Sequence, residues 1–163
     1  MLGVLLTYCK SKRVISLNNQ YLKALNDFKI KVELPVSWSD MDIFKHVNIK
    51  NYFRYFEAAR VRYFDEIGFG KYYESLGIAG VLSSTSCNFI VPLVYPEMIT
   101  VGAKISNFNK NGILMEHYIL NQEKCLSAVG ESCIVIFDFH KKKKILVPDF
   151  LRKAIECFEN GEK

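Results

Sequence analysis

The stretch IKNYFRYFEAARVRYFDEIGF, residues 49–69, determines the class of fold. Its apolar residues recur at spacings of three and four, which predicts a long helix with one buried face. Asn48 stands at the position of a helix N-cap, and Gly68 is a natural stop because the position after a helix favours a left-handed backbone. The residues of the predicted buried face are Ile49, Tyr52, Phe53, Phe56, Ala59, Tyr63, Phe64 and Ile67. So many aromatic rings on one face need a broad apolar surface to cover them.

Strand patterns before and after the helix predict that surface. Phe28–Val36 alternates apolar and polar residues, and Pro35 near its end is typical of a sheet edge. Asn111-Gly112 is a strong hairpin signal between two further alternating segments. The later expected strands are GVLSSTSCNFIVPL (80–93), EMITVGAKISNF (97–108), ILMEHYIL (113–120) and LSAVGESCIVIFDF (126–139), followed by a short helix in PDFLRKAIECFE (148–159). This order predicts a single α+β domain, residues 27–160, in which one antiparallel sheet wraps one long central helix.

The composition indicates one folded domain, with 163 residues, 50% of them hydrophobic, and a net charge of +5. Residues 1–26 are expected to be an extension of unknown role, since their charges follow a short apolar run, the reverse of a signal peptide. Five scattered cysteines predict reduced thiols and a cytoplasmic protein. The sequence shows no membrane-length apolar stretch, no ligand-spaced histidines and no basic stripe, so we expect no membrane, metal or nucleic-acid partner.

Two acids, an imidazole and an amide lie close together in SDMDIFKHVN, residues 39–48, directly before the helix. The first N–H groups of a helix lack partners and attract negative charge, so an oxyanion can be stabilised there. A carboxylate facing an electrophile at this place suits ester or thioester hydrolysis, as nucleophile or as general base. The alternative is a solvated loop whose acids are placed favourably near the positive end of the helix.

The longer stretch SDMDIFKHVNIKNYFRYFEAAR, residues 39–60, resembles the signature of hotdog-fold acyl-CoA thioesterases of the 4-hydroxybenzoyl-CoA thioesterase-like family. FIVPLVYPEMITV, residues 89–101, is similar to the second strand, turn and third strand of that family, and the resemblance covers about residues 28–140. It implies a hotdog fold and hydrolysis of acyl-CoA to a free acid and CoA, without a metal or an organic cofactor. It also implies a homodimer or a dimer of dimers with pockets built from both subunits, an assembly that open strand edges favour.

The resemblance also assigns roles to individual residues around the start of the helix. Asp42 matches the catalytic carboxylate, and the backbone N–H of Ile49 matches the oxyanion donor. His46 and Asn48 match the pocket residues of the family's HVN subset, although Ile49 replaces the second Asn usual there. Without the resemblance, His46 could shape the pocket by hydrogen bonding or take part in the chemistry with equal weight. Asn48 is more often a helix cap than a ligand contact, and Asp40 is expected to hold the loop. The acyl group is expected beside Tyr52, Phe53 and Phe56.

A run of four lysines, Lys141, Lys142, Lys143 and Lys144, has two interpretations. It is either a solvated strand end or a binding site for the phosphates of coenzyme A. Lysine can bind phosphate because its ammonium group acts as a compact positive charge.

Three rival functions are open to the same residues. Hydrolysis of acyl groups from acyl carrier protein would use the same acid. A dehydratase of the same fold is disfavoured because its His-rich motif with nearby prolines is absent. A non-catalytic acyl-CoA-binding domain is disfavoured because an acid occupies position 42 and no DNA-binding pattern accompanies it.

Overall fold

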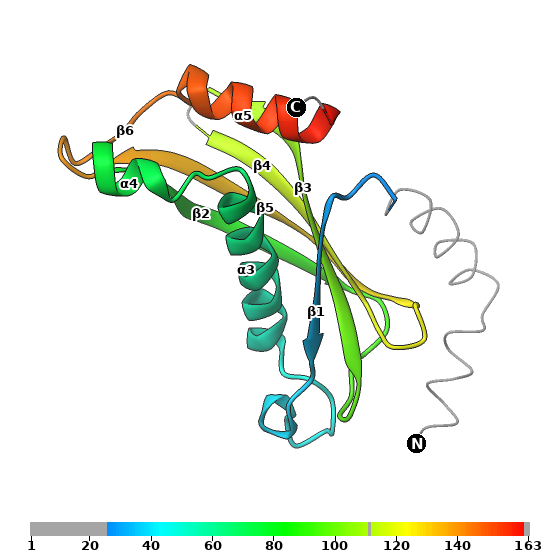
Figure 1. Ribbon diagram of the computed structural model, residues 1–163. Coiled ribbons are helices and arrows are strands. Elements are labelled where there is room, and N and C mark those ends of the chain that lie inside the picture. Colours follow the sequence, from blue (N-terminus) through cyan, green and yellow to red (C-terminus); the bar gives the residue numbers. More distant parts are fainter. Residues whose placement is uncertain (1–25, 111, 162–163) are drawn as a thin grey trace.

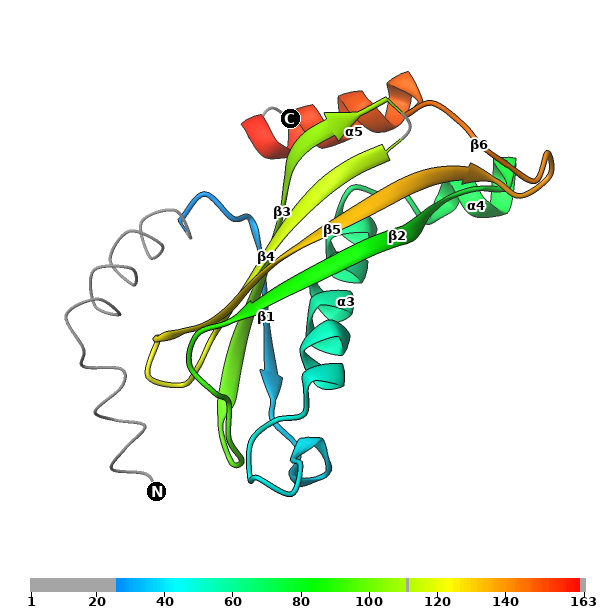
Figure 2. The same cartoon turned by 180° about the vertical axis from the view of Figure 1, so that it is seen from behind.

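The helix predicted from residue 49 lies in the hollow of a curled antiparallel sheet in the computed structural model (Figure 1; Figure 2). The structure describes residues 26–110 and 112–161, so residues 1–25 of the expected extension lie outside the described residues. In chain order the elements are β1 (Ile30–Pro35), the 3-10 helix η1 (Trp38–Asp40), α3 (Ile49–Glu66), α4 (Lys71–Leu76), β2 (Ile78–Phe89), β3 (Met98–Asn109), β4 (Gly112–Leu120), β5 (Leu126–Asp138), β6 (Lys143–Lys144) and α5 (Asp149–Asn160).

The caps of α3 are those that the sequence predicts. Asn48 Oδ1 accepts a hydrogen bond from the Lys50 N–H at 3.1 Å, and Gly68 takes a left-handed φ of 69° just after the helix. The inner face of the helix is fully buried at Phe56, Ala59 and Tyr63. The rings of Phe56 and Tyr63 supply much of the apolar area that holds the helix in the sheet.

The described strands form a six-stranded sheet in the order β1-β3-β4-β5-β2, with β6 paired to β5, and every pairing is antiparallel. β1, which ends at Pro35, lies at one edge, and β2 lies at the other. Asn109 pairs with Gly112 across the predicted hairpin. The α+β architecture is therefore confirmed. The sequence did not predict η1, α4 or β6, because elements of two to six residues are too short to show a period.

The C-terminal helix α5 is held to the core by one carboxylate. Glu159 Oε1 accepts hydrogen bonds from Tyr63 Oη at 2.7 Å and from the Ile105 N–H at 3.0 Å. The register between β3 and β4 shifts between Ile105 and Asn107, and such a bulge frees a backbone N–H from the strand ladder. A side chain of α5 thus satisfies a donor that the sheet leaves unpaired.

His117 of β4 is buried between the sheet and α3. Its ring stacks on Phe56 with the ring centroids 4.7 Å apart, and its Nε2 lies 3.0 Å from Ser132 Oγ. Gly130 of β5, which pairs with His117 of β4, leaves room for this stack, because a Cβ there would lie 2.4 Å from the Phe56 ring. Burial, together with the charge of Arg60, lowers the pKa of His117 to about 3.

We expect acid to destabilise the protein through His117. The unfolded chain binds a proton at this imidazole with a pKa of about 6.5, whereas the folded chain does not bind one until the pH nears 3. The free energy of unfolding should therefore fall below about pH 6.5, by up to about 1.4 kcal/mol per pH unit. Chemical denaturation between about pH 7 and pH 4.5 should give a shallower pH dependence for His117→Gln. Parallel curves for the two proteins would contradict this prediction.

Among the cysteines that the structure describes, one differs from the prediction. Cys87, Cys133 and Cys157 are free thiols, but Cys125 is disulfide-bonded. The prediction of reduced thiols is therefore wrong at Cys125, which weakens the cysteine argument for the cytoplasm. In the part of the chain that the structure describes, no helix has the length and the apolar character needed to span a membrane.

Candidate active site

The segment between β1 and α3 folds into a tight reverse turn that carries the acids and the histidine. Met41 and Val47 form an antiparallel bridge, and inside it the Asp42 N–H donates to the His46 carbonyl at 2.8 Å. The Val47 N–H donates to the Leu93 carbonyl at 2.9 Å, which ties the turn to the segment after β2. Residues that look merely consecutive in the sequence are thus held in one compact loop at the start of α3.

Asp40 is the buried anchor of this loop. Its carboxylate accepts hydrogen bonds from Arg54 Nη2 at 2.7 and 2.8 Å, from Tyr55 Oη at 2.8 Å and from the Ser37 N–H at 3.1 Å. Its carbonyl accepts from the Asn48 N–H at 2.9 Å. Both carboxylate oxygens are therefore occupied by protein donors, and this geometry supports a structural role for Asp40, not a chemical one.

Asp42 differs from Asp40 because it is half-buried and only one of its two carboxylate oxygens accepts hydrogen bonds from described residues. Its Oδ1 accepts a hydrogen bond from the Phe44 N–H at 2.8 Å and lies 3.5 Å from the His46 N–H. Among the described residues, no hydrogen bond reaches its Oδ2. The turn thus orients the carboxylate through one oxygen and leaves the other for a ligand or a water molecule, as a nucleophile or general base requires.

The start of α3, directly after the loop that carries this carboxylate, presents a backbone donor. The Asn48 side chain caps the Lys50 N–H, as described above, and the Ile49 N–H makes no hydrogen bond within residues 26–110 and 112–161. Ile49 is 62% exposed, so its prediction as part of the buried helix face is wrong, and the first turn of the helix is open to solvent there. An unpaired N–H at a helix N-terminus is a suitable donor to a developing oxyanion.

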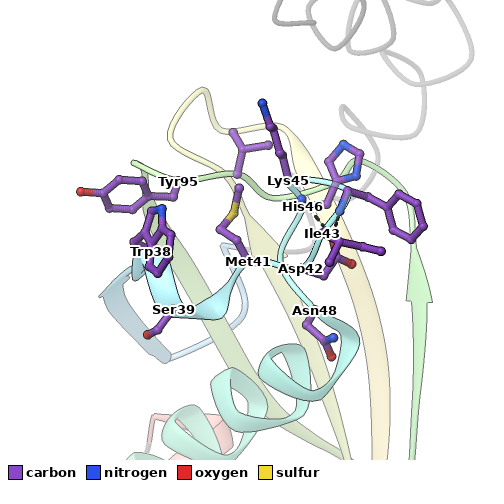
Figure 3. Close-up of a pocket in the computed structure, with 11 residues that line it drawn as sticks. Trp38, Ser39, Met41, Asp42, Ile43, Lys45, His46, Asn48 and Tyr95 are labelled. Atoms are coloured by element: carbon purple, nitrogen blue, oxygen red, sulfur yellow. Dashed lines mark hydrogen bonds between the residues drawn. The ribbon is translucent and has the colours of Figure 1, made fainter.

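Two pockets lie on either side of the loop. The larger, of about 1270 Å³, is formed by η1, the reverse turn and the segment before β3, and Figure 3 shows Asp42 and Asn48 on its wall. The smaller, of about 210 Å³, lies between the start of α3 and the end of β2 and is lined by Ile49, Tyr52 and Phe89 among others. His46 lines both pockets, so its side chain stands at the boundary between them.

The three aromatic residues expected at the acyl group occupy different environments. Tyr52 lines the smaller pocket, and its hydroxyl accepts a hydrogen bond from the Leu93 N–H at 3.2 Å. Burial raises the pKa of Tyr52 to about 12, so its hydroxyl stays protonated. Phe53 is half-buried, whereas Phe56 is 1% exposed and belongs to the core. The structure therefore brings Tyr52 to the site, but it places Phe56 behind the site.

The four lysines lie at the other end of the molecule from the reverse turn. Lys141 and Lys142 lie in the exposed turn after β5, and Lys143 and Lys144 form β6. This segment lies near α4, whereas the reverse turn lies beyond the opposite end of α3 (Figure 1). Lys141 is anchored to Asp138, which accepts from its N–H at 2.8 Å and from its Nζ at 3.3 Å. Within one subunit the structure does not bring these lysines to Asp42.

Several residues of the site were not predicted from the sequence. Trp38, Phe44 and Tyr95 line the larger pocket, and Phe89 lines the smaller one. Trp38 and Phe44 are 76% and 68% exposed, and aromatic residues beside a reactive loop were a signal available in the sequence. In the described part of the chain, no three His, Cys, Asp or Glu side chains are grouped closely enough to hold a metal ion.

Comparison with known proteins places the chain in a family. A family model described as the thioesterase-like superfamily matches residues 36–155. The long-chain acyl-CoA thioesterase FadM of Escherichia coli (strain K12) is 23% identical over 128 residues, which are 78% of this chain and 97% of FadM. The chloroplastic acyl-acyl carrier protein thioesterase ATL3 of Arabidopsis thaliana is 28% identical over 140 residues, 83% of this chain and 72% of ATL3.

Solved structures have the same fold. The PA2801 protein of Pseudomonas aeruginosa is 27% identical and superposes with a TM-score of 0.69 over 78% of this chain and 98% of that one. A thioesterase of Thermus thermophilus, complexed with coenzyme A and Zn, is 23% identical and superposes with a TM-score of 0.72 over 82% and 96% of the two chains. The expected hotdog fold is thereby confirmed.

Proposed function

The chain belongs to the thioesterase-like superfamily, and we propose that it is an acyl-CoA thioesterase, which hydrolyses acyl-CoA to a free acid and CoA. Two observations carry the proposal: one oxygen of the Asp42 carboxylate accepts no hydrogen bond among the described residues, and the N–H of Ile49, seven residues later at the start of α3, is unpaired there. The relation to FadM, whose name is that of a long-chain acyl-CoA thioesterase, supports CoA as the carrier.

In this mechanism the helix terminus binds the thioester carbonyl. The carbonyl oxygen accepts a hydrogen bond from the Ile49 N–H, and this bond strengthens as negative charge develops on the oxygen in the transition state. The positive end of the α3 dipole adds to the same stabilisation. No side chain is required for this step, which explains how isoleucine can stand at position 49.

Asp42 supplies the attack on the carbonyl carbon. Either Oδ2 attacks directly and forms an anhydride that water then cleaves, or the carboxylate removes a proton from a water molecule that attacks. In both routes the carbon–sulfur bond breaks and CoA leaves as a thiol after protonation. Oδ1 is held by the Phe44 N–H, so the turn keeps the carboxylate oriented during the reaction.

We assign the acyl chain to the smaller pocket. The smaller pocket is lined by Tyr52, Phe89 and Ile90, next to the Ile49 N–H. His46 stands between this pocket and the larger one, so it can separate the acyl group from the pantetheine arm. A single pocket of about 210 Å³ is small, and a second subunit beside β2 would extend it.

A panel of acyl-CoA substrates of graded chain length, with the released thiol measured, tests the proposal. We expect turnover on at least one length class and the same dependence on Asp42 throughout. A parallel assay uses the same acyl groups attached to acyl carrier protein. The relation to ATL3 makes hydrolysis of acyl groups from acyl carrier protein the second candidate function. Faster hydrolysis from the carrier protein would select the second candidate, and tight binding without hydrolysis of either would select a binding domain.

Assembly and location complete the proposal. The enzyme is proposed to be a homodimer, or a dimer of dimers, whose subunits meet at the free edge of β2. A cytoplasmic location remains a prediction.

A further inference from the structure

The end of the molecule opposite the reverse turn is a projection formed by α4 and by the turn between β5 and β6 (Figure 1). Residues 71–77 and 138–144 are called the tip below. The Phe139 N–H donates to the Gly77 carbonyl at 2.8 Å, which joins the turn after β5 to the end of α4. The Lys141 N–H donates to Asp138 Oδ1 at 2.8 Å and fixes the turn itself. Two segments that are far apart in the sequence are therefore held together as one body.

Gly77 makes this close approach possible. It follows α4 with a left-handed φ of 65°, and a Cβ at this position would lie 2.3 Å from the His140 ring. Its N–H donates to the Tyr73 carbonyl at 3.0 Å, so the last turn of α4 is fixed against the turn after β5. The side chains of the two segments thus form one surface.

The tip exposes large apolar side chains. Tyr73, Leu76 and Phe139 are 54%, 48% and 44% exposed. The rings of Tyr73 and Phe139 meet edge to face with their centroids 5.5 Å apart, and Phe137 meets Phe139 at 5.0 Å. These rings support one another, yet about half of Tyr73 and of Phe139 still faces water. A group of exposed apolar side chains on a folded domain marks an interaction surface.

Lysines accompany these apolar side chains. The tip contains five lysines, Lys71 and Lys141–Lys144, and two acids, Glu74 and Asp138. Asp138 is buried and already paired with Lys141, whose Nζ lies 3.3 Å from its carboxylate. Residues 142–144 are exposed and form no ion pair with the part of the chain that the structure describes. The tip therefore presents uncompensated positive charge next to exposed rings.

This combination of groups fits the surface of an anionic bilayer. Aromatic rings lie at the boundary between the head groups and the acyl chains, and a lysine ammonium reaches the lipid phosphates from a stem that lies along apolar surface. The tip contains lysines but no arginine. Interfaces between proteins are enriched in arginine and depleted in lysine, so an acidic protein fits the composition of the tip less well.

We infer that the tip binds anionic phospholipid surfaces, with Tyr73, Leu76 and Phe139 at the head groups and Lys142–Lys144 on the lipid phosphates. The inference goes beyond the proposed function and does not depend on it. The binding is peripheral and reversible, because three side chains bury far less apolar area than a spanning helix does. The expectation of no membrane partner rested on the lack of a spanning segment, a criterion that does not detect a surface of this kind.

Sedimentation of the full chain with vesicles tests the inference. We expect the protein to bind vesicles of phosphatidylserine and phosphatidylcholine in equal parts, to bind phosphatidylcholine alone far more weakly, and to be released as salt is added. The triple variant Lys142→Gln, Lys143→Gln and Lys144→Gln should lower the partition coefficient for the anionic vesicles about a hundredfold, given the usual contribution of each lysine at such a surface.

A matched control separates the tip from the overall charge of the protein. The triple variant Lys31→Gln, Lys110→Gln and Lys153→Gln makes the same change in net charge at exposed lysines outside the tip, and it should keep the native partition coefficient. The double variant Leu76→Ser and Phe139→Ser keeps every charge and should lower the partition coefficient about tenfold, because it removes the apolar contact. Native melting temperatures show that the variants are folded.

Each contrary result overturns the inference. Equal losses in the two lysine variants would show only a general attraction of a basic protein to anionic vesicles. Undiminished binding of the double variant would exclude an apolar contact with lipid. No vesicle binding by the native chain would exclude the lipid surface and select an acidic protein, and a changed mass of the tip variants by light scattering would show that a second copy covers the tip. Turnover is not needed for any of these measurements, so failure of the proposed function is seen separately.

Discussion

Asp42→Asn is expected to lower turnover by a factor of about a hundred or more, the range for a positioned base or nucleophile. The amide keeps the size of the carboxylate, and its oxygen can still accept the hydrogen bond of the Phe44 N–H, so the turn should stay folded. The charge that attacks the carbonyl or deprotonates water is lost. Binding of a non-hydrolysable acyl-CoA and the melting temperature should both be retained. Thiol release, calorimetric binding and thermal unfolding of the same preparation measure the three quantities.

Asp40→Asn is the matched control, because it makes the same chemical change two residues away. The Asp40 carboxylate holds Arg54 and Tyr55, so its loss should lower the melting temperature, while turnover per folded molecule falls less than in Asp42→Asn. His46→Ala should give a turnover between the two if the imidazole only shapes the pockets. Near-normal turnover of folded Asp42→Asn would overturn the catalytic assignment and favour an acyl-CoA-binding domain.

Phe56→Ala is expected to lower the free energy of unfolding by about 3–5 kcal/mol, the usual cost of truncating a buried Phe. The ring is 1% exposed, stacks on His117 and fills the space that Gly130 leaves open. The surrounding strands are fixed by their ladders, so the cavity should not collapse. Urea denaturation measures the loss, and a change below about 1 kcal/mol would show that Phe56 is not a core residue.

Phe53→Ala separates the acyl-binding role from the packing role. Phe53 is half-buried one turn before Phe56, with the two ring centroids 6.4 Å apart. Its truncation should cost less stability than that of Phe56. If it contacts the acyl chain, KM should rise for long acyl chains and change little for short ones. If KM changes equally for short and long acyl chains, Phe53 does not contact the acyl chain.

The central helix, the strand pattern and the fold class could be predicted without the structure. The spacing of aromatic residues after Ile49 predicted α3, and Asn48 and Gly68 predicted its ends, because caps and periodicity depend on neighbouring residues only. The Asn-Gly pair predicted the β3–β4 hairpin for the same reason. The family motif placed the candidate acid at Asp42, but the sequence alone could not assign different tasks to two acids in the same loop.

The different roles of those two acids became visible in the folded chain. Asp40 meets Arg54 and Tyr55, fourteen and fifteen residues away, and such pairings depend on how a loop packs against a helix. Only the fold shows that β2 is a free edge of the sheet and that the segment Lys141–Lys144 follows β5 at the other end of the molecule from the reverse turn. Local interactions are encoded within a few residues, whereas contacts between distant segments are selected by burial of the whole core. That is why the sequence identified the helix and its loop, and the fold decided which side chains face each other.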